Sequence, residues 1–260
     1  MSAAMEQDGS SGTQAVERLL HVLEVVAGSE SGADAGTIAS ELGLSPSTVY
    51  RLLGVLHREG YVMRDSHRYV LGRTVGALGL ALHRQVVATP RVRQLLERTR
   101  DQVRAPIYLT AFRAGEIILA HIAESRAHPR IAQLHVGFAD SSHATAFGKL
   151  MLAASTDEAV ARQLDEHSPL ALTSHSITGS GALRAELEKV RRDGIAIEVE
   201  EYMSRLACIA VPIRSSGGRV IGAVSASTTA DDFRSRADLI ELSLRRTAWT
   251  VSSELSAASA

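Results

Sequence analysis

The apolar residues near the N-terminus repeat at steps of three and four. Over residues 13–27 this spacing predicts a helix with one buried face, which Thr13 can cap. Residues 1–12 are rich in small and polar residues and lack such a repeat, so we expect a disordered tail there. The buried face of the helix is expected to contain Val16, Leu19, Leu20, Leu23, Val26 and Ala27.

The next two helices have clear end signals. Gly43 can end a helix over residues 36–42 because glycine readily adopts the left-handed conformation. Ser45 can cap the following helix, and Pro46 suits its first turn, where a backbone N–H has no helical partner. This third helix is expected to run to about residue 59 and to bury Val49, Leu52, Leu53 and Leu56.

Two short β-prone runs come next, at residues 61–64 and 68–71. They surround the polar turn 65–67, a pattern that predicts a hairpin. Two helices, a turn, a third helix and a hairpin, in this order, are typical of a winged helix-turn-helix. We therefore expect such a domain over residues 13–73.

The rest of the chain predicts a second, larger domain. Helical spacing over residues 74–87 indicates a connecting helix within a linker of residues 74–90. Strand-like and helical runs then alternate over residues 91–260, a mixture that favours an antiparallel sheet flanked by helices. The strands are expected at 107–113, 116–123, 195–200, 207–214 and 220–227, and the helices at 91–103, 146–154, 157–166, 181–192 and 231–255.

Composition narrows the class of protein. A length of 260 residues suits two domains, and 45% hydrophobic with 22% charged residues is ordinary for globular proteins. No apolar run approaches the ~20 residues of a membrane span, and residues 1–13 lack the pattern of a signal peptide, so a cytoplasmic protein with no membrane partner is expected. The single cysteine, Cys208, excludes an internal disulfide and a cysteine-rich zinc module.

Charge is distributed in a way that suits DNA binding. The formal net charge is −1, yet residues 45–73 contain five arginines and two acidic residues, a local excess of three positive charges. Only the major groove of B-DNA admits a helix and displays a distinct pattern for each base pair. The exposed face of the third helix and the hairpin therefore supply the candidate DNA-binding residues, with Arg51 ranked above the hairpin arginines: Ser45, Ser47, Thr48, Tyr50, Arg51, Arg64 and Arg68.

Several motifs, in order, resemble the isocitrate-lyase-regulator (IclR) family of bacterial transcription regulators. The likeness covers nearly the whole chain after Thr13. It is carried by residues 38–44, 47–53, 60–62, 68–72, 143–149, 191–194, 208–212 and 223–227.

The resemblance implies a mixed α/β fold of two domains, in which a helix joins the winged helix-turn-helix to a GAF-like α+β effector-binding domain. It implies a dimer, or a tetramer made of two dimers, that binds double-stranded operator DNA and a small organic effector, either a carboxylate or an aromatic molecule. Two positions depart from the family pattern: Pro46 stands where a basic residue is common, and Arg205 where a glycine often occurs. The implied effector-binding residues are Leu134, Ala146, Phe147, Glu198, Cys208, Ser225 and Ser227.

Other classes of function remain as alternatives. Cys208 with a histidine could form the nucleophile and base of a small-molecule-converting enzyme, although an apolar strand disfavours a thiolate. Four histidines could indicate a metal sensor, but their spacing fits no compact ligand pattern. They are His121, His128, His135 and His143. A DNA-packaging protein would have no use for the large second domain. We therefore expect no enzymatic activity, no cofactor and no metal.

Overall fold

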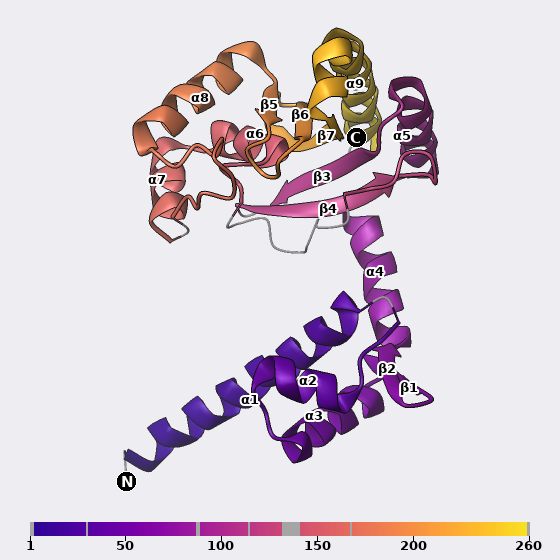
Figure 1. Ribbon diagram of the computed structural model, residues 1–260, viewed down its shortest axis with the longest axis vertical. Helices are drawn as coiled ribbons and strands as arrows, with labels where there is room; N and C mark the ends of the chain where they lie inside the picture. The colour runs from indigo at the N-terminus through magenta and orange to yellow at the C-terminus, as the bar shows by residue number, and fades with distance from the viewer. Residues whose placement is uncertain are drawn as a thin grey trace. The chain divides into compact units, whose positions relative to one another are not determined.

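The chain divides into two compact units, residues 1–85 and 86–260. The computed structural model describes residues 3–29, 31–86, 89–113, 115–131, 141–166 and 168–258 (Figure 1). Helix α4 (Arg73–Val86) leads from the first unit to the second, in the place where a connecting helix was expected. No helix in the described ranges is both long enough and apolar enough to cross a membrane.

Three helices form the core of the N-terminal unit: α1 (Ala3–Gly28), α2 (Ala35–Leu42) and α3 (Pro46–Arg58). The predicted end signals are confirmed, since Gly43 is left-handed with φ 62° and the Ser45 hydroxyl caps α3. The predicted inner face of α3 is also confirmed. Its buried residues are Val49, Leu52, Leu53 and Leu56.

The hairpin also matches its prediction. Strands β1 (Val62–Asp65) and β2 (Arg68–Leu71) pair antiparallel around a turn in which Ser66 has a positive φ of 55°. Tyr69 of β2 makes backbone hydrogen bonds with Ala33, in both directions at 3.0 and 2.8 Å. The hairpin is therefore fixed to the segment that precedes α2.

Helix α1 differs from its prediction in two respects. It begins at Ala3 rather than Thr13, so the residues expected to form a disordered tail continue the helix. Its buried residues are Val22 and Val26, whereas Val16 and Leu20 are exposed within the chain. The apolar spacing predicts a helix correctly, but the helix has more apolar surface than the core of one unit can cover.

The C-terminal unit is built on a five-stranded antiparallel sheet with the order β4-β3-β7-β6-β5. Its edges are β4 (Glu116–Ala123) and β5 (Ala196–Val199). Between them lie β3 (Ile107–Arg113), β7 (Val220–Thr229) and β6 (Leu206–Arg214). Because all neighbours pair antiparallel, the predicted sheet is confirmed, with strand ends within one or two residues of those expected.

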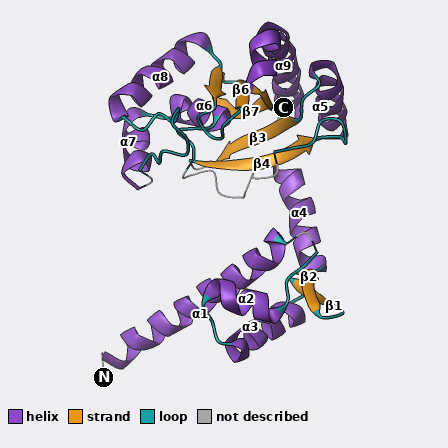
Figure 2. Cartoon of the chain, viewed as in Figure 1, coloured by secondary structure: helices purple, strands orange, loops and turns teal. Residues whose placement is uncertain are grey.

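Helices cover both faces of this sheet (Figure 2). One core lies between the sheet and helices α5 (Pro90–Val103) and α9 (Ala230–Ala258), and includes Ile209 and Val224. A second core lies between the other face and helices α6 (Ala146–Ala154) and α8 (Ser180–Asp193), and includes Cys208 and Ala223. Helix α7 (Asp157–Glu166) contributes Val160 to the second core. Since side chains alternate along a strand, neighbouring residues of β6 and β7 face different helices.

Candidate functional site: an exposed helix face and an enclosed pocket

The N-terminus of α3 carries a cluster of hydroxyl groups. Ser45 Oγ accepts a hydrogen bond from the backbone N–H of Thr48 at 3.3 Å, and it also lies 2.9 Å from Thr48 Oγ1 and 3.1 Å from Ser47 Oγ. These contacts hold the first turn of α3 in one arrangement. Short polar side chains and the positive end of a helix dipole are suited to binding phosphate oxygens.

Beyond this turn, α3 presents Tyr50 and Arg51 to solvent. Tyr50 is 60% exposed, and Arg51 is exposed and makes no hydrogen bond or ion pair within the described part of the chain. The opposite face of the helix is fully packed. Both side chains can therefore contact an external partner without breaking a contact in the protein.

The two hairpin arginines are already hydrogen-bonded to backbone or side-chain oxygens. Arg64 Nε donates to the carbonyl oxygen of Ser66 at 3.1 Å, within the hairpin turn. Arg68 Nη1 donates to Ser31 Oγ at 2.8 Å and to the carbonyl oxygen of Gly32 at 3.0 Å. Arg68 therefore fixes the hairpin to the chain before α2, so fewer of its donors remain for phosphate than at Arg51.

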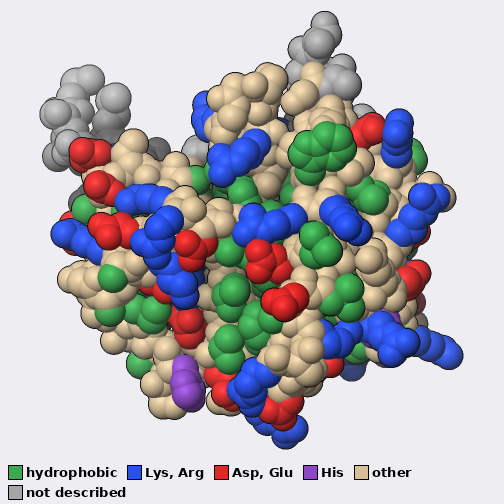
Figure 3. Space-filling model, turned by 90° about the horizontal axis from the view of Figure 1, so that it is seen from above, with side chains coloured by type: hydrophobic (Ala, Val, Ile, Leu, Met, Phe, Trp, Pro, Cys, Tyr) green, Lys and Arg blue, Asp and Glu red, His purple; other side chains and the backbone are tan. Residues whose placement is uncertain are grey.

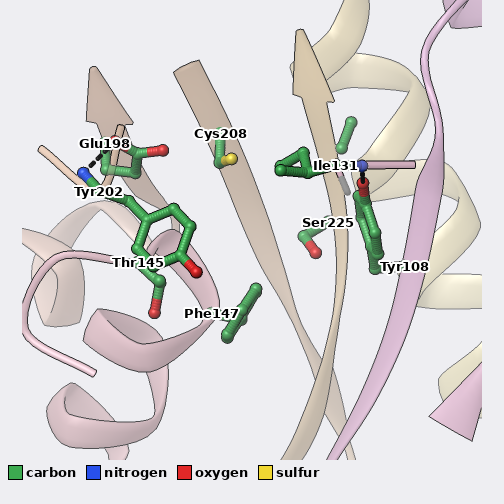
Figure 4. Close-up of a pocket in the computed structure, with 9 residues that line it drawn as sticks. Tyr108, Ile131, Thr145, Phe147, Glu198, Tyr202, Cys208 and Ser225 are labelled. Carbon is green, nitrogen blue, oxygen red and sulfur yellow. Dashed lines mark hydrogen bonds between the residues drawn. The ribbon is translucent and has the colours of Figure 1, made fainter. Parts of the chain in front are cut away.

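The second candidate site is a small cavity of about 10 Å³ between α6 and the sheet. Glu198, Cys208, Ser225 and Tyr108 reach it from the strands β5, β6, β7 and β3, which lie side by side (Figure 4). It lies at the N-terminal end of α6, from which Phe147 enters. Its described lining consists of Tyr108, Ile131, Thr145, Phe147, Glu198, Tyr202, Cys208, Ser225 and Ala226.

Three residues that line this cavity carry a buried polar atom without a hydrogen bond. Thr145 Oγ1, Glu198 Oε1 and Ser225 Oγ are buried and have no hydrogen bond in the described structure. Nearly all buried polar atoms in proteins are paired, and an unpaired one costs about 1–3 kcal/mol. Because the cavity has room for about one water molecule, an ordered water is a suitable partner for one of these atoms.

Glu198 is the acidic group of the pocket. Its Oε2 accepts hydrogen bonds from the backbone N–H groups of Glu201 at 3.1 Å and Tyr202 at 3.4 Å. Burial raises the pKa of Glu198 to about 7, although hydrogen bonds from the Cys208 thiol and from these backbone groups act in the opposite direction. Near neutral pH this carboxyl therefore exists in both its charged and its neutral form.

Cys208 and Tyr108 are held in their neutral forms. Burial, with the nearby Glu198 charge, raises the pKa of the Cys208 thiol well above its usual value. Burial also raises the pKa of Tyr108 to about 12, while its hydroxyl lies 3.0 Å from Ser227 Oγ and accepts a hydrogen bond from the N–H of Ile131 at 3.1 Å. Neither group provides a reactive anion at physiological pH.

A buried lysine lies beside the pocket. Lys149 of α6 is fully buried, and its Nζ is 2.5 Å from Glu201 Oε1 and 3.4 Å from Glu186 Oε1. It also donates to the carbonyl oxygen of Ile197 at 3.3 Å. Lys149 thereby fixes the chain around Glu198 against α6, and its charge is matched by Glu201 and Glu186.

Four of the seven predicted effector-binding residues line the pocket: Phe147, Glu198, Cys208 and Ser225. Ala146 and Ser227 are buried and are not among the lining residues, although Ser227 Oγ lies 3.0 Å from the hydroxyl of Tyr108, which is one of them. Leu134 lies outside the described residues. Sequence reasoning missed Tyr108, Ile131, Thr145, Tyr202 and Ala226 as lining residues.

Two other predictions from the sequence concern Arg205 and a group of four histidines. Arg205, which departs from the family pattern, has a positive φ of 64° and is exposed, and it is not among the lining residues. Of the four histidines considered as metal ligands, His135 is outside the described ranges, and His143 Nε2 lies 2.9 Å from the carbonyl oxygen of Leu170. The described side chains contain no group of three or more metal ligands.

Comparisons with known proteins place both units in one family. Residues 15–66 match the IclR helix-turn-helix domain, and residues 80–253 match the C-terminal domain of the bacterial transcriptional regulator IclR. The chain is 30% identical over 222 residues to the transcriptional regulator BhcR of Paracoccus denitrificans, covering 85% of this chain and 79% of BhcR. It is also 30% identical over 220 residues to the glycerol operon regulatory protein of Streptomyces coelicolor, covering 81% and 83% of the two chains.

Solved structures support the same assignment. A transcriptional regulator from Rhodococcus has a TM-score of 0.73 and 25% identity, with 94% of this chain and 99% of that chain covered. An IclR homologue from Microbacterium hydrocarbonoxydans, crystallised with 4-hydroxybenzoate, has the same fold, with a TM-score of 0.73, 24% identity and the same coverage. The chain belongs to the IclR family of bacterial transcriptional regulators.

Proposed function

We propose that this chain regulates transcription by binding operator DNA through α3 and the β1–β2 hairpin, and that a small organic effector in the α6 pocket changes its affinity for DNA. The observation that carries this function is the pairing, in one chain, of an exposed polar helix face with a cavity beside α6, three of whose lining residues carry a buried polar atom without a hydrogen bond. The protein acts in the cytoplasm and without catalysis.

Within the DNA interface, Arg51 contacts a base edge or the adjacent phosphate, and Tyr50 contacts the same groove. Ser45, Ser47 and Thr48 bind the phosphate backbone at the start of α3. Arg64 contacts backbone phosphates from the hairpin. Arg68 acts mainly by holding the hairpin in place, because it is already bonded to Ser31 and Gly32.

The exposed apolar residues support a homo-oligomer. Val16 and Leu20 on α1 are 57% and 49% exposed, and Leu78 on α4 is 54% exposed. A second set, Leu239, Leu242 and Trp249, follows one face of α9, and Figure 3 shows hydrophobic side chains among charged ones on the side viewed from above. The first set pairs two chains, so that two α3 helices meet two half-sites, and the second joins two dimers.

An enzymatic role is disfavoured by the chemistry of the pocket. A nucleophilic cysteine needs a low pKa, whereas burial raises the pKa of Cys208. In addition, His143 lies against the carbonyl oxygen of Leu170 and does not line the pocket. The pocket is therefore suited to hold a ligand rather than to convert it.

The DNA-binding role can be tested with one pair of variants. Arg51→Ala should weaken binding to operator DNA by about 1–3 kcal/mol, that is, roughly 5- to 150-fold, in fluorescence anisotropy titrations at fixed salt. Arg184→Ala is the matched control, because Arg184 is an exposed arginine on α8 in the other unit. Equal affinities of the two variants for DNA would contradict a role of α3 in the groove.

A further inference from the structure

The start of α4 is bonded to the chain that follows α3. A helix leaves its first N–H groups without partners inside the helix. At this junction the N–H of Gly72 donates to the carbonyl oxygen of Tyr61 at 2.7 Å, and the N–H of Thr74 donates to the carbonyl oxygen of Gly60 at 3.0 Å. The residues directly after α3 therefore supply partners for the N–H groups at the start of α4.

A side chain reinforces this junction. Thr74 Oγ1 donates to the carbonyl oxygen of Glu59, the C-terminal cap of α3, at 3.0 Å. The C-terminal end of a helix carries a partial negative charge and the N-terminal end a partial positive one, so the end of α3 and the start of α4 attract each other. Thr74 thus joins α4 to α3 through both its N–H group and its hydroxyl.

The junction also requires glycine at two positions. A Cβ at Gly72, which is buried, would lie 2.3 Å from the carbonyl oxygen of Gly60. A Cβ at Gly60 would lie 2.8 Å from Thr74 Oγ1, and Gly60 has a positive φ of 76°. Glycine permits both this backbone angle and so close an approach. The two segments can therefore lie at this distance only because positions 60 and 72 lack side chains.

The core of the N-terminal unit contributes little to the direction of α4. None of the described side chains of α4 belongs to the apolar core of this unit or packs against it. Leu78 is 54% exposed, and Val75 is half-buried. The bonds of Thr74 and the close contact at Gly72 therefore fix the angle between α4 and α3.

This angle connects two surfaces with different roles in the proposed function. Leu78 of α4 belongs to the surface that we propose to pair two chains, whereas Arg51 of α3 is proposed to contact DNA. In a twofold dimer, the distance and the rotation between the two α3 helices then depend on how each α3 is held against its own α4. The spacing of the two half-sites in the DNA must match this geometry.

We propose that Thr74 and Gly72 are positioning residues for DNA recognition, which set the half-site spacing that the dimer accepts by holding α4 against the end of α3. This inference rests on the DNA binding and the pairing of chains proposed above, and it adds the residues that fix their geometry. Neighbouring base pairs are about 3.4 Å apart along the DNA axis and rotated by about 35°. A half-site displaced by one base pair is therefore out of reach of an α3 that is held at one angle.

Selection from a library of random double-stranded DNA tests this with the full-length protein, because it yields the half-sites and their spacing together. Fluorescence anisotropy then compares two duplexes, one with the selected spacing and one with a base pair inserted between the half-sites. We expect the wild-type protein to select one spacing and to bind the lengthened duplex at least about tenfold more weakly, since a displaced half-site loses its base contacts.

One pair of variants tests the close contact. Gly72→Ala forces the start of α4 away from Gly60, so this protein should select a different or a broader set of spacings. Its preference for the wild-type spacing over the lengthened duplex should fall to about threefold or less. Gly76→Ala in the same helix is the matched control, because a Cβ there meets nothing within 4 Å. It should keep the spacing and the preference of the wild-type protein.

A second pair tests the hydroxyl of Thr74. Thr74→Val removes the hydrogen bond to Glu59 with little change of shape, so its preference for one spacing should lie between those of the wild-type and Gly72→Ala proteins. Thr74→Ser keeps the hydroxyl and should restore the wild-type preference. Loss of folded protein weakens binding to both duplexes by the same factor, so the ratio of the two affinities reports positioning and not stability.

The outcomes separate this inference from the proposed function. Gly72→Ala and Thr74→Val proteins that keep the wild-type spacing and ratio would overturn the inference, and if Gly72→Ala does not fold, the two Thr74 variants decide. A wild-type protein that selects paired half-sites at many spacings would also overturn it, with DNA binding left intact. Selection of no recurrent sequence by the wild-type protein would contradict the proposed function itself.

Discussion

At the scale of single residues, two buried ionisable groups of the C-terminal unit, Lys149 and Glu198, differ in how their charge is compensated. Lys149 is surrounded by two carboxylates and a carbonyl oxygen, so its charge is compensated within the protein. Glu198 has Oε2 bound to backbone N–H groups, and the Cys208 thiol is its side-chain neighbour. The first arrangement stabilises the fold, whereas burial raises the pKa of Glu198 to about 7.

The role of Lys149 can be measured by unfolding. Lys149→Met removes the cation and leaves Glu201 buried without its partner, so we expect a loss of about 3–5 kcal/mol in the free energy of unfolding of the C-terminal unit. Glu186→Gln should cost far less, because Glu186 is 3.4 Å from Nζ and more exposed. Urea denaturation followed by circular dichroism compares the two, and equal effects would contradict this account.

At the scale of elements, the first turn of α6 packs closely against the chain that precedes it, beside the pocket. A Cβ at Gly148 would lie 2.3 Å from the carbonyl oxygen of Ser142 and 2.5 Å from Thr145 Oγ1. The helix can therefore start beside the pocket only if position 148 lacks a side chain. A shift of this turn would also move Thr145 and Phe147, which line the cavity.

Gly148→Ala should consequently reduce both stability and effector binding. Overpacking of this kind typically costs about 1–3 kcal/mol, and the displaced first turn should weaken binding of the pocket's ligand as well. Gly181→Ala in α8 is the control, because a Cβ there meets nothing within 4 Å. Gly181→Ala should leave the melting temperature unchanged or raise it slightly. An equal fall in the melting temperatures of both variants would show that the close contact at Gly148 is unimportant.

Local signals in the sequence were sufficient for most elements. Ser45, Pro46 and Gly43 mark helix ends by mechanisms that act within a few residues, so their prediction was accurate. The pocket was predicted only in part because its lining comes from strand register. Tyr108 faces Ser225 across β3 and β7, and nothing within either strand indicates that pairing.

The start of α1 and its buried face were the least accurate predictions. Periodicity alone cannot tell which apolar residues face the core and which face another chain. Val16 and Leu20 fit the predicted stripe yet lie exposed, while Val22 is buried. The stripe therefore extends beyond the core of the unit, and its exposed part is the surface proposed above to pair two chains.

At the scale of the whole molecule, the proposed function relies on pairing of chains. A helix in one major groove reads only a few base pairs, and a twofold dimer doubles the contact with a symmetric operator. Under the proposal above, the exposed apolar residues of α1 and of α9 are the separate surfaces for a dimer and for a dimer of dimers. Effector binding to the second unit can then bias how two DNA-binding units are presented together.

The dimer surface can be tested by charge insertion. Leu20→Glu places a carboxylate on the exposed apolar part of α1, so we expect the dimer to dissociate in sedimentation experiments and operator binding to be lost with it. Glu24→Gln, at another exposed position of the same helix, should leave the mass unchanged. A Leu20→Glu protein that keeps the wild-type mass would contradict pairing through α1.

The central claim is the coupling between the pocket and DNA, and the most direct measurement is operator affinity as a function of effector. Fluorescence anisotropy would follow the purified protein on labelled DNA from upstream of its own gene, against scrambled DNA, with and without a small organic molecule shown to bind the C-terminal unit. The account predicts selective binding that weakens with salt and a change of at least fivefold in operator affinity at saturating effector, a typical coupling being about 1–3 kcal/mol. An affinity that stays the same across the whole effector titration would contradict it.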